Sequence, residues 1–370
     1  MGTETIVLAG GGTAGHVNPL LATARELAED GHEIICLGTK EGLESRLVPA
    51  AGFELCEVAK IPLPRKPSPD LLRLPGAMRR QVKELRDLFT RRGVDVVTGF
   101  GGYVSTPAYL AAKKEGIPVV IHEQNARPGL ANKVGARFAA VVATTFETTP
   151  LSAKQGMTVN VGLPLRAPIA ELARARADGT DGPIREQAAE RFGLDPARPT
   201  LVITGGSLGA LVINEAMAQA ARDLPADLQV IHLTGRGKDA EVRHEVGERE
   251  GYVILDYLDD MEAALSLASL VVCRSGAGTV SEMSALGIPA IYVPLAIGNG
   301  EQRLNAADVV AAGGARIIDN HRCTARTMLA AVTELMEDAD KRQAMAEAAA
   351  SCGHLDAAQT LAGLIEGVQR

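Results

Sequence analysis

A glycine-rich run that ends in a histidine, GGGTAGH at residues 10–16, directly follows the first apolar segment of the chain. Glycines spaced as G-x-G-x-x-G let a ligand phosphate approach the unpaired amides at a helix N-terminus. His16 would lie on the first turn of that helix, where the helix dipole disfavours the imidazolium form and keeps the ring neutral, as a general base requires. The sequence leaves two roles open for His16: a general base, or a side chain that caps the turn.

Other clusters of small or polar residues also follow apolar segments, and they are HEQN (122–125), GGS (205–207), SGAGTVSE (275–282) and NGEQRLNA (299–306). Small residues before a helix commonly hold a diphosphate without a metal. Glu282 would lie a turn inside its helix, too far in to help an anion, and its carboxylate suits a pair of sugar hydroxyls. The only D-x-D sequence, Asp338 to Asp340, lies in a polar helical stretch, so we predict no metal site.

The elements that must position these clusters alternate between short β-branched runs and Ala/Leu-rich runs of helical period. This alternation indicates βαβ units on parallel sheets, in which the carboxyl ends of the strands form the ligand crevice. The expected strands are 5–10, 33–38, 94–99, 118–123, 139–145, 200–205, 228–235, 252–258, 269–276 and 290–295.

The chain also repeats part of its own pattern. VLAGGGTAGH near the start recurs as VITGGSLGA from residue 202, and the segment 100–125 is echoed by 274–302, each with a glycine turn and the tripeptide GIP. The repeat predicts an α/β protein of two doubly wound, Rossmann-like domains that face each other across a cleft. Pro164 interrupts the pattern, so we expect the domain boundary near 162–166.

Composition narrows the class of protein. The chain has 370 residues, of which 46% are hydrophobic and 22% charged, as in a globular multi-domain protein rather than a disordered or fibrous one. Its five cysteines are odd in number and far apart, which argues against a disulfide framework or a zinc knuckle. The start resembles no signal peptide and no run of about 18 apolar residues occurs, so cytoplasmic is the expected compartment.

Charge is unevenly distributed. The net charge is −7, which disfavours nucleic acid as a partner, yet residues 60–92 hold ten basic residues and only three acidic ones. Prolines predict an irregular loop up to Pro75 that carries Leu63, Leu71, Leu72 and Leu74, followed by a helix from Gly76. On that helix an apolar stripe of Met78, Val82, Leu85 and Phe89 opposes Arg79, Arg80, Lys83 and Arg86. The segment either docks on an anionic membrane surface or packs its stripe into the core and leaves its charges solvated.

Taken together, GGGTAGHVNP, GGYVSTP, GIPVVIHEQN, GGSLGA, CRSGAGTVSE and GNGEQRLNA resemble the bacterial N-acetylglucosaminyltransferases of peptidoglycan synthesis, the MurG type. The resemblance covers about residues 3–365 and implies the glycosyltransferase B fold. It implies an acceptor-binding, membrane-facing domain over 1–163, a UDP-GlcNAc-binding domain over 164–348, and a last helix within 349–370 that packs back on the first domain.

The resemblance also implies which residues contact substrate. Leu258 would meet uracil through its backbone, Glu282 the ribose, Ser207 the diphosphate and Gln302 the GlcNAc hydroxyls. The full implied set is Thr13, Ala14, Gly15, Asn125, Arg166, Ser207, Leu258, Ala277, Gly278, Thr279, Val280, Ser281, Glu282 and Gln302.

The reaction implied is the inverting transfer of GlcNAc from UDP-GlcNAc to the 4-hydroxyl of MurNAc in undecaprenyl-pyrophosphoryl-MurNAc-pentapeptide. His16 is the candidate base, no cofactor is expected, and the enzyme would work as a peripheral protein on the cytoplasmic face of the cell membrane. Two other enzymes stay open: a UDP-GlcNAc 2-epimerase of the same architecture, and a nicotinamide-dependent oxidoreductase built on the first glycine run. The oxidoreductase does not explain the repeated crevice, and the basic segment argues against the epimerase.

Overall fold

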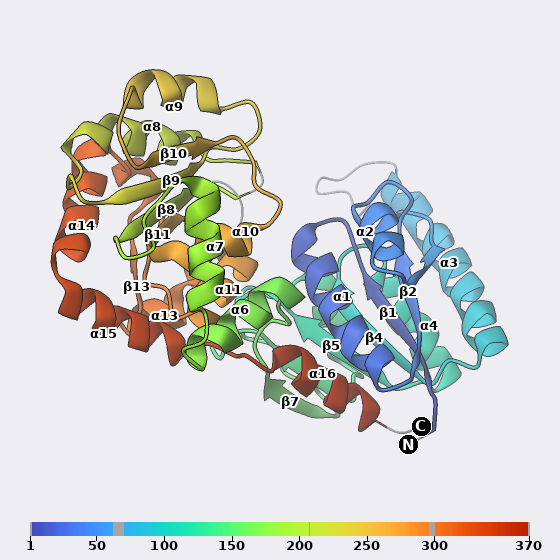
Figure 1. Ribbon diagram of the computed structural model, residues 1–370. Helices are drawn as coiled ribbons and strands as arrows, with labels where there is room; N and C mark the ends of the chain where they lie inside the picture. The colour runs from blue at the N-terminus through green and yellow to red at the C-terminus, as the bar shows by residue number, and fades with distance from the viewer. Residues whose placement is uncertain (1, 62–69, 207, 296–299, 369–370) are drawn as a thin grey trace. The chain divides into compact units, whose positions relative to one another are not determined.

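The computed structural model describes residues 2–61, 70–206, 208–295 and 300–368, with 70–73 described by their backbone alone (Figure 1). Packing divides the chain into two compact units. Unit 1 runs up to Arg166 and also takes in the C-terminal stretch from Asp356, whereas unit 2 is Ala167–Leu355.

Unit 1 is built on a parallel sheet in the order β3-β2-β1-β4-β5-β6-β7. Its strands are β1 (Thr5–Gly10), β2 (Glu33–Gly38), β3 (Glu54–Glu57), β4 (Val96–Gly101), β5 (Val119–Glu123), β6 (Val141–Thr144) and β7 (Met157–Asn160). Its helices are α1 (Ala14–Glu29), α2 (Glu44–Ala50), α3 (Asp70–Arg92), α4 (Ser105–Glu115), α5 (Leu130–Gly135) and α16 (Ala357–Glu366).

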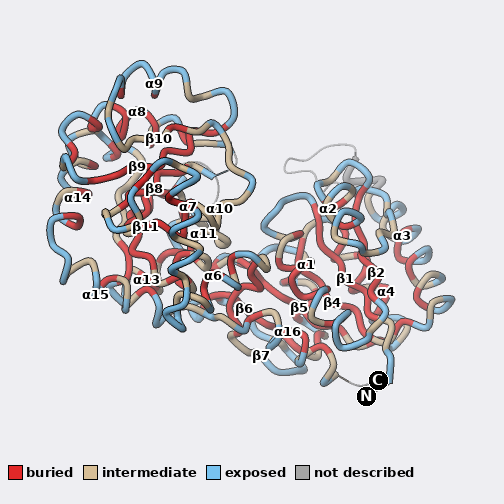
Figure 2. Tube along the Cα trace, in the orientation of Figure 1, coloured by how far each residue is buried: buried red, intermediate tan, exposed pale blue. Residues whose placement is uncertain are grey.

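The β1 strand shows how the sequence builds the core of unit 1. Successive side chains of a strand point to opposite faces of the sheet. Ile6 and Leu8 join the cluster formed with α1 and α16, and Val7 and Ala9 join the cluster formed with α3 and α4. Because helices cover both faces, the strand has no polar alternation after Thr5, and it is buried from Ile6 to Gly10 (Figure 2).

Unit 2 repeats this topology on a second parallel sheet, in the order β10-β9-β8-β11-β12-β13. Its strands are β8 (Thr200–Thr204), β9 (Gln229–Leu233), β10 (Tyr252–Leu255), β11 (Ala268–Cys273), β12 (Ala290–Tyr292) and β13 (Ala315–Ile317). Its α-helices are α6 (Ala167–Ala177), α7 (Gly182–Phe192), α8 (Leu211–Ala220), α9 (Asp239–Val246), α10 (Met261–Leu267), α11 (Ala277–Ala285), α12 (Glu301–Asn305), α13 (Ala307–Ala311), α14 (Ala325–Glu337) and α15 (Ala339–Ala350).

The two sheets confirm the prediction of two Rossmann-like α/β domains. In each sheet the strand order reverses beside the first strand, at β1 and β4 in unit 1 and at β8 and β11 in unit 2. Ligands of such sheets bind outside the carboxyl ends of the strands at this reversal. The glycine runs at 10–15, 205–209 and 275–278 follow β1, β8 and β11, so all three lie at such a point.

The C-terminal boundary differs from the expected one. Residues 349–355 belong to unit 2 rather than to the last helix. They are held there by close backbone packing: a Cβ atom on Gly314 would lie 2.5 Å from the amide nitrogen of Ala349, and one on Gly353 would lie 2.7 Å from the carbonyl oxygen of Ser284. Only α16, which packs on α1 through Leu361 and Ile365, returns to unit 1.

The expected loop before Gly76 is wrong in part, because α3 begins at Asp70 and continues through Pro75. Proline has a helical φ angle, so the helix tolerates it at the loss of one hydrogen bond. Leu71, Leu72 and Leu74 are therefore helical, whereas Leu63 lies outside the described residues. The stripe below them is core: Val82, Leu85 and Phe89 are buried and Met78 packs against them.

Candidate active site

The first glycine run forms the turn between β1 and α1. Gly12 has φ of +87°, a left-handed conformation that favours glycine. Thr13 is the extended N-cap residue of α1, and its side chain makes no capping hydrogen bond. Gly12, Thr13, Ala14 and Gly15 are all exposed. The amides of this first turn are therefore accessible to an anionic ligand.

His16 is held in one orientation by the turn that precedes it. Its Nδ1 lies 3.1 Å from the carbonyl oxygen of Gly11 and 3.0 Å from Oγ1 of Thr13. Because a carbonyl oxygen can only accept a hydrogen bond, the contact with Gly11 places the ring proton on Nδ1. The lone pair of the neutral ring then belongs to Nε2, which is the nitrogen that could accept a proton from a substrate.

The turn after β4 closes against the first glycine turn. A Cβ atom on Gly102 would lie 2.7 Å from the carbonyl oxygen of Gly11, and one on Gly101 would lie 3.2 Å from Nε2 of His16. Both glycines have positive φ angles. Any side chain at these two positions would therefore displace the first turn or crowd the histidine ring.

A buried carboxylate lies beneath the first turn. Glu44, the first residue of α2, is 0% exposed. Its Oε2 accepts a hydrogen bond from the Gly12 amide at 2.9 Å, and its Oε1 accepts two from the amide and hydroxyl of Thr39, each at 2.8 Å. Burial by itself would raise the pKa of Glu44, but the hydrogen bonds from Gly12 and Thr39 hold it below its ordinary value. The side chain is thus an ionised anchor that ties the turn after β1 to the turn after β2.

The HEQN cluster, one of the polar clusters that follow apolar segments, is mainly internal. His122, Glu123 and Gln124 are buried, and only Asn125 is partly exposed. The Glu123 carboxylate accepts hydrogen bonds from the amides of Asn125 and Gly129 and from the side chain of Asn132. Burial raises the pKa of Glu123, against these hydrogen bonds. The cluster therefore shapes the loop that presents Asn125.

The second glycine run is anchored by the neighbouring turn of unit 2. Gly209 and Gly235 both have positive φ angles, and a Cβ atom on Gly235 would lie 2.6 Å from the Cα of Gly209. The ammonium of Lys238 donates to the carbonyl oxygen of Leu208 at 2.5 Å. Ser207, which the sequence places on the diphosphate, lies outside the described residues.

The third run leads into α11, whose N-cap residue Gly276 is extended and has no side chain to cap the helix. Of the six residues predicted to contact the donor here, Val280 is buried and Ala277, Gly278, Thr279, Ser281 and Glu282 are partly exposed. Arg274 fixes the base of the turn by donating to the carbonyl oxygens of Val293 and Pro294. The first-turn amides of α11 are therefore presented on a rigid base.

Three other predicted residues lie outside the glycine runs. Leu258, partly exposed, follows β10. Gln302 lies on α12, and its Oε1 accepts a hydrogen bond from the Leu295 amide at 2.9 Å. Arg166, also partly exposed, is the last residue of the first stretch of unit 1.

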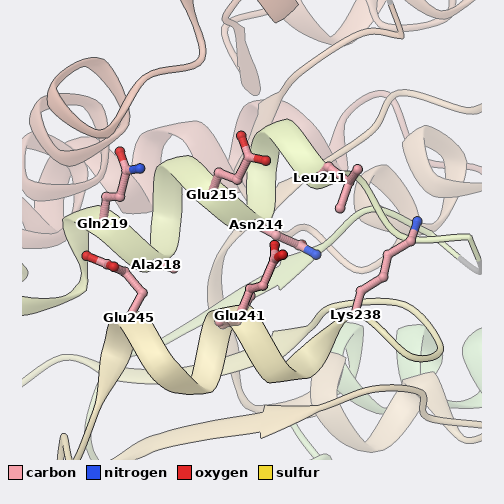
Figure 3. Close-up of a pocket in the computed structure, with 9 residues that line it drawn as sticks. Leu211, Asn214, Glu215, Ala218, Gln219, Lys238, Glu241 and Glu245 are labelled. Carbon is pink, nitrogen blue, oxygen red and sulfur yellow. The ribbon is translucent and has the colours of Figure 1, made fainter.

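A pocket between α8 and α9 holds none of the predicted substrate residues (Figure 3). Glu215, Glu241 and Glu245 line it, with Lys238 at one end. Three carboxylates against one ammonium do not suit a diphosphate. Asp338, from the D-x-D sequence, accepts a hydrogen bond from the Lys341 amide as the N-cap of α15. Within the described residues, no group of three His, Cys, Asp or Glu side chains could hold a metal ion.

Comparison with protein families decides between the enzymes that this arrangement allows. The N-terminal domain model of glycosyltransferase family 28 matches residues 6–144, and the C-terminal domain model of the same family matches residues 200–361. The chain belongs to glycosyltransferase family 28. The first match lies within unit 1, and the second covers most of unit 2 and ends in α16. Each match includes at least one of the glycine runs described above.

Proteins similar to this chain over nearly its full length include named transferases. A protein of Bifidobacterium adolescentis, 48% identical over 96% of this chain and 95% of its own length, is named UDP-N-acetylglucosamine--N-acetylmuramyl-(pentapeptide) pyrophosphoryl-undecaprenol N-acetylglucosamine transferase. The crystal structure of Acinetobacter baumannii MurG superposes with a TM-score of 0.80 at 29% identity, covering 99% of this chain and 100% of that one.

The fold by itself is shared more widely than the activity. The UDP-GlcNAc 2-epimerase of Neisseria meningitidis, solved with UDP-GlcNAc bound, superposes with a TM-score of 0.72 but is only 14% identical, over 99% of this chain and 100% of that one. The family models and the 48% identity, rather than the fold, therefore favour the transferase over the epimerase.

Proposed function

We propose that this family-28 chain transfers GlcNAc from UDP-GlcNAc to the 4-hydroxyl of the MurNAc unit of undecaprenyl-pyrophosphoryl-MurNAc-pentapeptide, with inversion at the anomeric carbon. The observation that carries the proposal is full-length similarity to proteins named for this transfer, at 48% identity. The product is a lipid-linked β-1,4 disaccharide for peptidoglycan synthesis.

Unit 2 binds the donor in this proposal. The first-turn amides of α8 and α11 face the diphosphate, and the helix dipoles stabilise the charge that develops on departing UDP by up to ~2 kcal/mol per helix terminus. The Leu258 backbone meets uracil, Glu282 the ribose and Gln302 the GlcNAc hydroxyls. Thr13, Ala14, Gly15, Asn125 and Arg166 complete the nucleotide-sugar contacts from unit 1.

His16 removes the proton of the acceptor hydroxyl. Its Nε2 takes the proton of the 4-OH while the oxygen attacks the anomeric carbon of GlcNAc. The bond between that carbon and the β-phosphate oxygen breaks, and its electron pair leaves with UDP. The contact of Nδ1 with the Gly11 carbonyl supports this role, because it leaves the lone pair of the neutral ring on Nε2.

We also propose that unit 1 docks on the anionic cytoplasmic face of the membrane, where the lipid-linked acceptor lies. Arg79, Arg80 and Lys83 are exposed on α3, and they are called the basic face here. Arg86 and Arg92 of the same helix instead pair with Glu115 and with Glu33 and Glu54. The charge available to a membrane is therefore smaller than the sequence segment suggests. Each engaged basic residue contributes about 1 kcal/mol near an anionic surface.

An assay of UDP release tests the activity. The full chain is incubated with UDP-GlcNAc, UDP-GalNAc or UDP-glucose, each with and without an undecaprenyl-pyrophosphoryl-MurNAc-pentapeptide acceptor. We expect release only with UDP-GlcNAc and acceptor together. UDP release from UDP-GlcNAc at equal rate without acceptor would contradict the proposal and favour a hydrolase. Conversion of UDP-GlcNAc to its 2-epimer with no UDP released would favour an epimerase.

A further inference from the structure

The peptide group between Gly11 and Gly12 is held at both ends by side chains. Its N–H, on Gly12, donates to Oε2 of Glu44 at 2.9 Å, and its C=O, on Gly11, lies 3.1 Å from Nδ1 of His16. A peptide group is planar and its C=O and N–H point in opposite directions in the trans form, which is the form of all described peptide bonds here. Glu44 and His16 therefore contact opposite edges of a single rigid peptide group.

We propose that Glu44 is a positioning residue that acts on His16 through this peptide group, as a carboxylate-peptide-histidine relay. The inference rests on His16 acting as the base. The negative carboxylate attracts the Gly12 N–H, which makes the Gly11 oxygen a stronger acceptor, since hydrogen bonds in a chain polarise one another. The Gly11 oxygen in turn fixes the Nδ1–H tautomer and stabilises the imidazolium that forms when Nε2 takes a proton.

Glycine makes such a relay necessary at this turn. Both residues that flank the peptide group are glycines, and Gly12 has φ of +87°. Without an anchor this peptide plane can rotate at little steric cost, and a rotated plane would turn its N–H toward Nδ1. His16 would then lose the contact that places its proton on Nδ1.

The surroundings of Glu44 are shaped for its carboxylate. A Cβ atom on Gly11 would lie 2.5 Å from Oε1, one on Gly42 would lie 2.1 Å from both oxygens, and one on Gly38 would lie 2.3 Å from the Cγ. The side chain is fully buried, yet within the described part of the chain it makes no ion pair and is satisfied by two turn amides and one hydroxyl. Its charge is thus directed at the two turns rather than at a partner cation.

Thr39 offers a matched control for the stability of this site. Its hydroxyl donates to Oε1, the carboxylate oxygen that does not contact Gly12. The Thr39→Val variant removes a buried hydrogen bond of the same carboxylate but keeps the bond to Gly12. A loss of activity that the Glu44 variants share with Thr39→Val therefore reflects lower stability. A loss of activity seen only in the Glu44 variants reflects the relay.

The test compares Glu44→Gln, Glu44→Leu and Thr39→Val in the UDP-release assay across pH, with melting temperature and UDP-GlcNAc affinity measured alongside. We expect about tenfold or greater loss of kcat in Glu44→Leu, from the sensitivity of catalysis to misplacement of a reacting group. The change in donor KM should be smaller, because the proposal assigns the uracil, ribose, diphosphate and GlcNAc contacts to unit 2. The acidic limb of the kcat profile should move to lower pH in both Glu44 variants, because the imidazolium loses a stabilising carboxylate. Thr39→Val should have a lower melting temperature than the wild type, with the same kcat and the same acidic limb of the kcat profile.

A double variant separates this inference from the proposed base. In His16→Ala the relay has no target, so adding Glu44→Leu should slow the enzyme no further. Full activity of His16→Ala would overturn the base and the relay together. Two outcomes would overturn the relay alone. In the first, His16→Ala is slow but Glu44→Leu keeps the wild-type kcat. In the second, the losses of kcat in the two single variants multiply in the double variant.

If Glu44→Leu does not fold, hydrogen exchange of the wild-type full chain still tests the relay. Gly12 is an exposed residue whose amide donates to Glu44, so we expect this hydrogen bond to slow exchange of the amide. Protection of this amide that decreases in Glu44→Gln, whose neutral oxygen is a weaker acceptor than a carboxylate, supports the relay. Exchange at the rate of an unstructured glycine in the wild type would overturn it.

Discussion

His122 Nε2 lies 2.8 Å from the carbonyl oxygen of Gly162, which joins the end of β5 to the segment that leaves β7. Since the carbonyl can only accept, Nε2 carries the ring proton and Nδ1 is the acceptor for the Gln124 amide, 3.0 Å away. A second ring proton would have to bind to Nδ1, where it would face the N–H group that Gln124 already donates to this nitrogen. The site therefore accommodates the neutral ring, and burial lowers the pKa of His122 to about 4.

Stability should fall as pH falls through the acidic range. His122 has a depressed pKa in the folded chain and an ordinary one near 6.5 in the unfolded chain. Between these values only the unfolded chain binds the proton, so the free energy of unfolding decreases by up to about 1.4 kcal/mol per pH unit for this group. Urea unfolding of wild type and His122→Asn at pH 7, 6 and 5 should show a shallower pH dependence in the variant. An exposed control, His321→Asn, should keep the wild-type slope, and equal slopes in all three would refute the assignment.

Replacing the base should affect turnover rather than donor binding. We expect His16→Ala to lower kcat by about 10²-fold or more, the usual contribution of a positioned base, with UDP-GlcNAc affinity nearly unchanged by calorimetry. A tenfold or smaller loss combined with a lowered melting temperature would instead show that His16 only caps the turn.

Replacing the ribose contact should affect binding. Glu282→Ala should raise the KM for UDP-GlcNAc more than it lowers kcat, because a contact with the ribose stabilises the ground and transition states alike. Glu337→Ala, at the exposed end of α14, is the control. Unchanged donor KM in Glu282→Ala would exclude the ribose role.

Chelation should leave the reaction intact. No acidic pair was predicted to hold a metal against the diphosphate, and the proposal assigns charge stabilisation to helix termini. Activity should therefore persist after EDTA treatment and dialysis. Complete loss of activity after EDTA treatment, restored by added Mg²⁺, would contradict a metal-free mechanism.

Membrane binding should depend on the basic face. We expect Arg79→Gln, Arg80→Gln and Lys83→Gln combined to weaken co-sedimentation with phosphatidylglycerol vesicles at low salt, with little binding to phosphatidylcholine vesicles in any variant. Arg86→Gln is the matched control, because Arg86 already pairs with Glu115. If the triple variant binds like wild type, this face is not the docking surface.

The sequence alone predicted those elements whose local pattern matches their environment in the fold. Apolar runs buried on both faces predicted most strands of the two sheets, and glycine turns located the ends of β1, β8 and β11. The short edge strands β3 and β13 were not predicted, because ELCE and ARI are too short and too polar to show a pattern. The final helix shows one apolar face, and its packing partner, α1, follows from the fold alone.

Three features were decided only by the tertiary structure. The stripe on α3 is core because α4 and the sheet lie beneath it, and a helical period alone does not distinguish a covered face from a membrane-facing one. The HEQN side chains are buried with partners that the fold brings to them: Asn132 of α5 donates to the Glu123 carboxylate, and the Gly162 carbonyl contacts His122. Glu44 carries no sequence motif; it became a site residue because parallel strands bring the turns after β1 and β2 together, and a carboxylate buried between them must satisfy its charge with their amides.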